Sequence, residues 1–163
     1  MIEVKLTAAE ISSSLIYGVR LNFFMPPMMQ QAIQSGRLIH SRLGYTNSKT
    51  FSRYFTVNNE NVLIVGMPDR VDENFVYELK TYHSAKSRET NLKVAQIQIQ
   101  VYSFLTGLKQ GRIIMYDVGL DKITDEIEVV FDAKLLKGFV KKALKLKELT
   151  QKFQKEYKVI QDR

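Results

Sequence analysis

The chain has 163 residues, with 24 Lys or Arg against 17 Asp or Glu, which gives a formal net charge of +7 at pH 7. It contains no cysteine, which excludes disulfides, thiolate zinc sites and iron–sulfur clusters. It has no run of about 18 apolar residues and no apolar segment near the start, so we expect no membrane span and no signal peptide. These properties predict one globular domain over 1–163, located in the cytoplasm.

The charge is unevenly distributed along the chain. Residues 134–163 hold 10 of the Lys and Arg and 3 of the Asp and Glu, whereas residues 1–133 hold 14 of each kind. The whole net charge therefore lies in the C-terminal segment. Such a basic stripe is typical of a protein that binds a polyanion, and the alternative is a lysine-rich helix face that only contacts solvent.

A capping box begins the first predicted helix, directly after residues 2–6, which suit a short strand. The Thr7 hydroxyl can accept from the Glu10 N–H while the Glu10 carboxylate accepts from the Thr7 N–H. The helix should run through Val19. Two prolines follow, and they disfavour further helix, so we expect residues 22–27 to close it.

Residues 28–43 are predicted to form a second helix with one broad apolar side, made of Met29, Ile33, Leu38 and Ile39. Gly36 lies inside this helix, where it costs about 1 kcal/mol relative to alanine, so it could allow close packing against another backbone. His40 lies one turn later on the same face. A helical histidine is usually a surface or core residue, but beside carboxylates it becomes a plausible ligand for Mn²⁺ or Mg²⁺.

Four predicted strands follow, at residues 50–57, 62–65, 69–72 and 75–80. Asn58 and Asn59 suit the first turn between them. Gly66 and Pro68 interrupt the chain after the second strand. A two-residue turn at Glu73 and Asn74 would join the last two strands as a hairpin.

The register of this hairpin brings two acidic residues together. Asp72 would pair with Phe75, which places Asp69 directly opposite Glu78, with Cβ atoms about 5 Å apart. Lys80 would share their face of the sheet, because side chains two residues apart point to the same side. The opposite face carries Phe75, Tyr77 and Leu79, and we expect it to face the core.

Like charges in cross-strand positions are destabilising unless a counter-ion balances them. A hard divalent cation is one such counter-ion, since Mg²⁺ is commonly held by one or two carboxylates together with substrate phosphate. A neighbouring lysine could then orient or deprotonate an attacking water, or stabilise charge on phosphorus. The alternative is an exposed ion cluster on a solvated sheet face.

The rest of the chain alternates helix, strands and helix. Residues 84–88 are predicted to form a polar loop, and residues 89–106 a helix whose core stripe is Val94, Ile97, Val101, Phe104 and Leu108. Strands at 111–118 and 127–131 follow, with a turn at 121–122. Residues 134–163 form a basic amphipathic helix with the apolar stripe Leu136, Phe139, Ala143, Leu146, Leu149, Phe153 and Tyr157.

Four short motifs in this order resemble those of the PD-(D/E)XK nuclease superfamily, and most closely its RecB-type and CRISPR-associated RecB-like exonucleases. They are Gly36 with His40, Gly66 with Asp69, Glu78-Leu79-Lys80, and Gln98 with Tyr102. The resemblance covers residues 7–131. It implies an α/β (α+β) fold with a restriction-endonuclease-like core, in which helices flank a mixed central β-sheet, and to this the chain adds its long basic C-terminal helix.

The resemblance also implies roles for these residues. His40, Asp69, Glu78 and the carbonyl of Leu79 would hold Mg²⁺ or Mn²⁺, and Lys80 would position or activate the water. Gln98 and Tyr102 would order the site and contact the nucleic acid, which completes a catalytic set of Asp69, Glu78, Lys80, Gln98 and Tyr102. Further phosphate contacts are expected from basic residues outside the motifs, namely Lys86, Arg88, Lys141 and Lys145.

The chain departs from many CRISPR-associated relatives, which hold an iron–sulfur cluster on one N-terminal and three C-terminal cysteines. Here Tyr17-Gly18-Val19-Arg20 occupies the place of the first cysteine, and the basic helix occupies the place of the others. That helix is expected to close the fold or to form a homodimer through residues 134–157.

The favoured function is a metal-dependent, exonuclease-like deoxyribonuclease acting on DNA. The alternatives are a nucleic-acid-binding accessory subunit on the same fold, with little or no activity, and an α+β scaffold with no nucleic-acid role. The sequence leaves open RNA against DNA, single against double strands, strand polarity, and endonuclease against exonuclease action.

Overall fold

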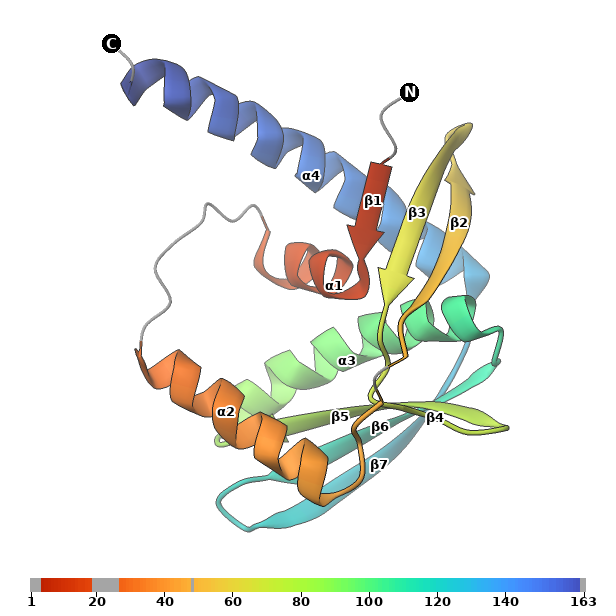
Figure 1. The fold of residues 1–163 in the computed structure, drawn as a ribbon, viewed down its shortest axis with the longest axis vertical. Helices are drawn as coiled ribbons and strands as arrows, with labels where there is room; N and C mark the ends of the chain where they lie inside the picture. The colour runs from red at the N-terminus through yellow and green to blue at the C-terminus, as the bar shows by residue number, and fades with distance from the viewer. Residues whose placement is uncertain (1–3, 19–26, 48, 162–163) are drawn as a thin grey trace.

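The structure is a computed structural model that describes residues 4–18, 27–47 and 49–161 (Figure 1). In chain order its elements are β1 (Val4–Thr7), α1 (Ala8–Tyr17), α2 (Pro27–Arg42), β2 (Phe51–Val57), β3 (Glu60–Gly66), β4 (Arg70–Val71), β5 (Phe75–Tyr82), α3 (Ala85–Thr106), β6 (Gln110–Asp117), β7 (Lys122–Val130) and α4 (Ala133–Gln161). Among these helices none is long and apolar enough to cross a membrane.

The strands form two mixed sheets with helices packed around them. One sheet has the order β1-β3-β2 and the other β4-β5-β6-β7, and each contains a single parallel pair, β1 with β3 and β5 with β6. The expected mixed α/β class is confirmed, but the strands are divided between two sheets where one central sheet was predicted. The chain crosses from one sheet to the other between Gly66 and Arg70, where Pro68 has no N–H for a strand ladder.

Helix α3 lies at the centre of the molecule, between α4 and the sheet that contains β5 (Figure 1). It contacts both sheets as well as α1 and α4. Its buried residues therefore extend well beyond the predicted stripe and include Ala95, Ile99 and Leu105. The helix also begins earlier than predicted, because Ser84 caps it reciprocally with Ser87. The segment 84–88, predicted as a loop, is thus the cap and first turn of α3.

The helix cap, the turn and the hairpin that are set by residues close together in the sequence agree with the sequence predictions. Thr7 and Glu10 form both hydrogen bonds of the capping box. Asn58 and Asn59 have positive φ angles of 52° and 62°, as the turn between β2 and β3 requires. The hairpin register is also confirmed, because Arg70 pairs with Tyr77. The predicted passage of the first helix through Val19 and its closure at 22–27 fall on residues 19–26, outside the described part of the chain.

Both faces of β5 are buried, which differs from the sequence interpretation. Tyr77 and Leu79 are buried as expected, but in a small cluster with Ile39 of α2 and not in the main core. The opposite face, which carries Val76 and Glu78, packs toward the main core beneath α3. Glu78 is only 4 % exposed. The alternative of an ion cluster on a solvated sheet face is therefore wrong for this carboxylate.

The predicted apolar side of α2 does not form a packed face. Leu38 is 72 % exposed and Ile33 is also exposed, so that only Ile39 is buried; the side chain of Met29 lies outside the described part. A Cβ atom added to Gly36 would lie 3.5 Å from Thr81 Oγ1, an ordinary contact. Close backbone packing therefore does not require this glycine. Much of α2 remains open to solvent.

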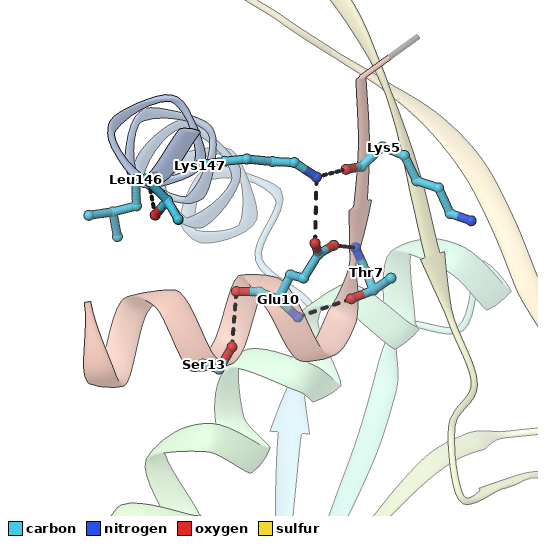
Figure 2. A network of polar contacts seen from close by, with 7 residues as sticks. Lys5, Thr7, Glu10, Ser13, Leu146 and Lys147 are labelled. Atoms are coloured by element: carbon cyan, nitrogen blue, oxygen red, sulfur yellow. Dashed lines mark hydrogen bonds and ion pairs between the residues drawn. The ribbon is translucent and has the colours of Figure 1, made fainter. Parts of the chain in front are cut away.

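The C-terminal helix α4 is attached to the start of the chain. Figure 2 shows Lys147 reaching from α4, where its Nζ lies 2.6 Å from the Lys5 carbonyl oxygen and 3.5 Å from Glu10 Oε1. The predicted stripe is buried at Leu136 and Ala143, but farther along the helix it emerges, and Phe153 is 49 % exposed. The side chain of Tyr157 lies outside the described part.

Candidate active site

A cleft of about 860 Å³ lies between α2, the end of β5 and the first turns of α3. The residues that the resemblance implies as metal ligands, together with Lys80, all contribute to its lining: His40, Asp69, Glu78, Leu79 and Lys80. They come from α2, from the crossing between the two sheets, and from β5. The fold thus brings together side chains that are far apart in the sequence.

Asp69 is held in the crossing segment by hydrogen bonds on both of its sides. Its Oδ2 accepts from the Leu79 N–H at 2.7 Å, and its Oδ1 lies 3.3 Å from His40 Nδ1. The Asp69 carbonyl accepts from the Asn47 N–H at 2.9 Å. The segment is therefore tied to β5, to α2 and to the chain that follows α2.

Glu78 and Lys80 form a partly buried ion pair, with 2.5 Å between Lys80 Nζ and Glu78 Oε1. The pKa of Glu78 is raised to about 7, chiefly by burial and also by the charge of Asp69, while Lys80 and His40 act in the opposite direction. For His40, burial lowers the pKa, but the hydrogen bond and charge of Asp69, with the charge of Glu78, outweigh it, so that the pKa is raised. The site therefore concentrates groups that titrate near neutral pH.

The donor types fit a divalent cation, although the side chains are not gathered around one point. Among the described residues, no three His, Asp or Glu side chains form a cluster that could already hold a metal ion. The Glu78 carboxylate contacts Lys80, and one Asp69 oxygen accepts from the Leu79 N–H. Two carboxylates, a carbonyl and an imidazole nonetheless suit Mg²⁺ or Mn²⁺, and a buried carboxylate with a raised pKa gains from a neighbouring cation.

Gln98 and Tyr102 lie behind the cleft and are not part of its lining. They are 7 % and 5 % exposed on α3. The pKa of Tyr102 is raised by burial and then by the charges of Glu78 and Asp69. Gln98 Oε1 is buried without a hydrogen-bond partner. This position suits a role in ordering the site, and direct contact with nucleic acid stays a prediction.

The four basic residues expected to meet phosphates lie outside the cleft lining. Lys86 is exposed in the first turn of α3, whereas Arg88 pairs with Asp125 Oδ2 at 2.9 Å. Lys141 and Lys145 are exposed on α4, on the far side of α3 from the sheet that carries Glu78 (Figure 1). Any contact they make with DNA would therefore lie away from the acidic pair.

Several residues that line the cleft were not predicted as functional, among them Arg37, Tyr45, His83 and Asn91. Asn91 donates to the Thr81 carbonyl at 2.8 Å and so fixes the first turns of α3 to β5. A signal for Arg37 was present in the sequence, because it lies three residues before His40 and hence on nearly the same helix face. Tyr45 and His83 carried no such signal.

No protein-family model and no curated protein match this chain. Solved structures do match. SSO0001 has a TM-score of 0.65 with 17% identity, over 90% of this chain and 77% of its own. The phage-related exonuclease from Haemophilus somnus 129PT has a TM-score of 0.54 with 15% identity, and the match covers 92% of this chain and 82% of the exonuclease. The alkaline exonuclease LHK-Exo from Laribacter hongkongensis has a TM-score of 0.52 with 13% identity, and the match covers 96% of this chain and 94% of LHK-Exo.

These identities show the fold alone. The chain has the restriction-endonuclease-like fold of these exonuclease structures, in which helices flank mixed sheets.

Proposed function

We propose that this chain is a divalent-metal-dependent deoxyribonuclease with exonuclease-like action, related to the RecB-type nucleases. The observation that carries the proposal is the buried Glu78 carboxylate, whose pKa is raised to about 7 inside a cleft it shares with Asp69, His40 and Lys80. A buried acid beside a second acid costs stability, and acids with strongly shifted pKa values are concentrated at functional sites. The similarity of the fold to that of two exonucleases supports hydrolysis of phosphodiesters as the function of this site.

In this proposal, His40, Asp69, Glu78 and the Leu79 carbonyl hold Mg²⁺ or Mn²⁺. The chemistry that a bound divalent ion supplies is activation of a water and stabilisation of the charge on the phosphate oxygens. Asp69 is already oriented for this task by the Leu79 N–H and by His40.

Lys80 is the group that acts on the water. Its ammonium is now held by Glu78 at 2.5 Å, so engagement of Glu78 with a cation would leave Lys80 free to face the water and the phosphate. Tyr102 and Gln98 support the acidic pair from α3 and exclude solvent behind it. The present pairing of Glu78 with Lys80 also favours the alternative function, in which the fold binds nucleic acid and cleaves slowly or not at all.

The test is cleavage of end-labelled single- and double-stranded DNA by the purified chain in Mg²⁺, Mn²⁺ or EDTA. The wild type is compared with Lys80→Ala, and Lys109→Ala serves as the control for loss of a positive charge outside the cleft. We expect metal-dependent products that decrease at least about a hundredfold in Lys80→Ala, the lower end expected for loss of a general acid or base, and that persist in Lys109→Ala.

Two other outcomes contradict the proposal. Products that form equally well with Lys80→Ala would remove this residue from the mechanism. Binding of DNA without cleavage under any metal condition would instead support the accessory-subunit function. The ladder of products from end-labelled DNA separates exonuclease from endonuclease action and gives the strand polarity.

A further inference from the structure

One wall of the cleft is a continuous stripe along α2 that ends at His40. It consists of Ala32, Ile33, Gly36, Arg37 and His40, which recur at helical spacing and all line the cleft. Along the helix axis Arg37 lies about 4.5 Å from His40, and Ile33 lies about 10 Å from it. The stripe therefore leads away from the acidic pair for the length of a few nucleotides.

Arg37 differs from the other arginines of the described chain. Arg42, Arg88 and Arg112 form ion pairs with carboxylates. The remaining two also have partners, since Arg53 donates to the Phe104 carbonyl and Arg70 lies over the Tyr77 ring. Within the part of the chain that the structure describes, Arg37 makes no ion pair and no side-chain hydrogen bond. Among the described arginines, it is also the only one that lines the cleft.

The other charges of the cleft explain why a phosphate would need Arg37. The floor presents Asp69 and Glu78, which repel an anion. The two nearest cationic groups are already engaged with them, since Lys80 contacts Glu78 at 2.5 Å and His40 contacts Asp69 at 3.3 Å. A guanidinium forms bidentate hydrogen bonds with phosphate and keeps its charge at any physiological pH. Arg37 thus supplies the electrostatic attraction for a phosphate that Asp69 and Glu78 cannot provide.

From these observations we infer that the α2 stripe guides one strand of nucleic acid into the cleft, with Arg37 holding the phosphate next to the one that is cleaved. This inference rests on the proposed nuclease function for the cleaved phosphate. A cleft of about 860 Å³ has the size of a small-molecule pocket, which suits a short length of a single strand. Ile33, exposed beyond Arg37, provides an apolar surface for a base of that strand.

The experiment compares wild type, Arg37→Ala, Arg37→Lys and Lys109→Ala in binding a short single-stranded oligodeoxythymidylate in EDTA over a series of salt concentrations. Arginine, lysine and alanine are all strong helix formers, so these substitutions in α2 keep the fold. Lys109 is exposed beyond the C-terminal end of α3 and does not line the cleft. It controls for the loss of one charge elsewhere.

We expect Arg37→Ala to weaken binding roughly tenfold, the effect of removing a charge-assisted hydrogen bond, and to reduce the salt slope by about 0.7, the share of one single-strand phosphate. Arg37→Lys should keep the slope and lose part of the affinity. In cleavage with Mn²⁺, Arg37→Ala should raise KM while kcat stays close to that of the wild type.

The inference is overturned if Arg37→Ala binds with the same affinity and slope as Lys109→Ala. It is separable from the nuclease proposal. A wild type that binds through Arg37 but never cleaves would refute the nuclease and keep the strand path. A wild type that cleaves, with no effect of Arg37 on binding or KM, would refute the strand path alone.

Discussion

Glu78 is the residue of the candidate site whose burial costs the fold the most stability. It lies on the face of β5 that carries Val76, where the neighbouring side chains are apolar core residues. Its partner Lys80 is itself partly buried, so the pair is poorly solvated and contributes little net stability. A hydrophobic residue at this position would pack without that cost. The proposed nuclease function would give a reason to find a carboxylate here.

The raised pKa of Glu78 predicts a pH dependence of the free energy of unfolding. The pKa is about 7 in the folded chain against 4.5 in the unfolded chain, so between these values the folded state binds more protons. Stability must therefore fall as the pH rises through that window. Relative to Glu78→Gln, the wild type should lose on the order of 2 kcal/mol between about pH 5 and about pH 7.5.

Urea unfolding in EDTA at these two pH values measures the effect. The comparison with Glu78→Gln includes the loss of the part of the raised His40 pKa that comes from the charge of Glu78. Parallel pH profiles for the wild type and Glu78→Gln would show that the carboxylate is not buried in the way described, and would weaken its assignment to the site.

At the scale of elements, the end of β3 and the C-terminal turns of α3 approach so closely that a glycine is required between them. A Cβ atom added to Gly66 would lie 2.8 Å from Tyr102 Cε1 and 3.0 Å from Leu105 Cδ1. Both distances are shorter than van der Waals contact. Gly66 therefore fixes how Tyr102 packs, and through it the support behind Glu78.

Gly66→Ala should consequently destabilise the chain by about 1–3 kcal/mol, as overpacking of a core does, and displace the Tyr102 ring. Gly36→Ala is the matched control, since its Cβ meets only Thr81 Oγ1 at 3.5 Å. There the gain in helix propensity should stabilise the chain by about 0.5–1 kcal/mol. Chemical denaturation of both variants checks this. Equal effects of the two substitutions would contradict the difference in packing.

The elements also show which features a sequence can specify. The hairpin of β4 and β5 and the capping box of α1 follow from residues within a few positions of each other, and both were predicted. The start of α3 was missed because Ser84 pairs with Ser87, where a capping box usually has Glu or Gln. The apolar side predicted for α2 failed because its leucine and one isoleucine face solvent. The periodicity of apolar residues identifies a helix, but it does not show which other elements pack against that helix.

At the scale of the whole molecule, the division into two sheets was beyond sequence reasoning. The parallel pairs join Val4 with Val62 and Phe75 with Gln110, and such distant pairing leaves no local signal. The candidate site was nevertheless predicted from motifs, because each motif is a short local pattern that can be read whatever elements lie between it and the next. Arg37 was overlooked, since its importance depends on what the other cations of the cleft contact.

The basic helix α4 is the largest feature whose role remains a prediction. Its exposed Leu149 and Phe153 continue the apolar stripe beyond the body of the fold, and this keeps homodimerisation as a hypothesis that light scattering can test. Its lysines at 141 and 145 are exposed and are not part of the cleft lining, and α4 itself lies across α3 from the sheet that contains β5 (Figure 1). A DNA chain must therefore extend beyond the cleft to reach them.

This geometry predicts that the effect of the α4 lysines depends on substrate length. Replacing Lys141 and Lys145 together by glutamine should weaken binding of long DNA and lower the salt slope by about 0.9 for each duplex phosphate that these lysines neutralise. On a short oligonucleotide confined to the cleft, kcat/KM should not change, because none of the residues lining the cleft belongs to α4. The double replacement by arginine keeps the charge and should behave like the wild type. An unchanged salt slope on long DNA would assign α4 a purely structural role, and an equal decrease on both substrates would mean that these lysines act at the cleft itself.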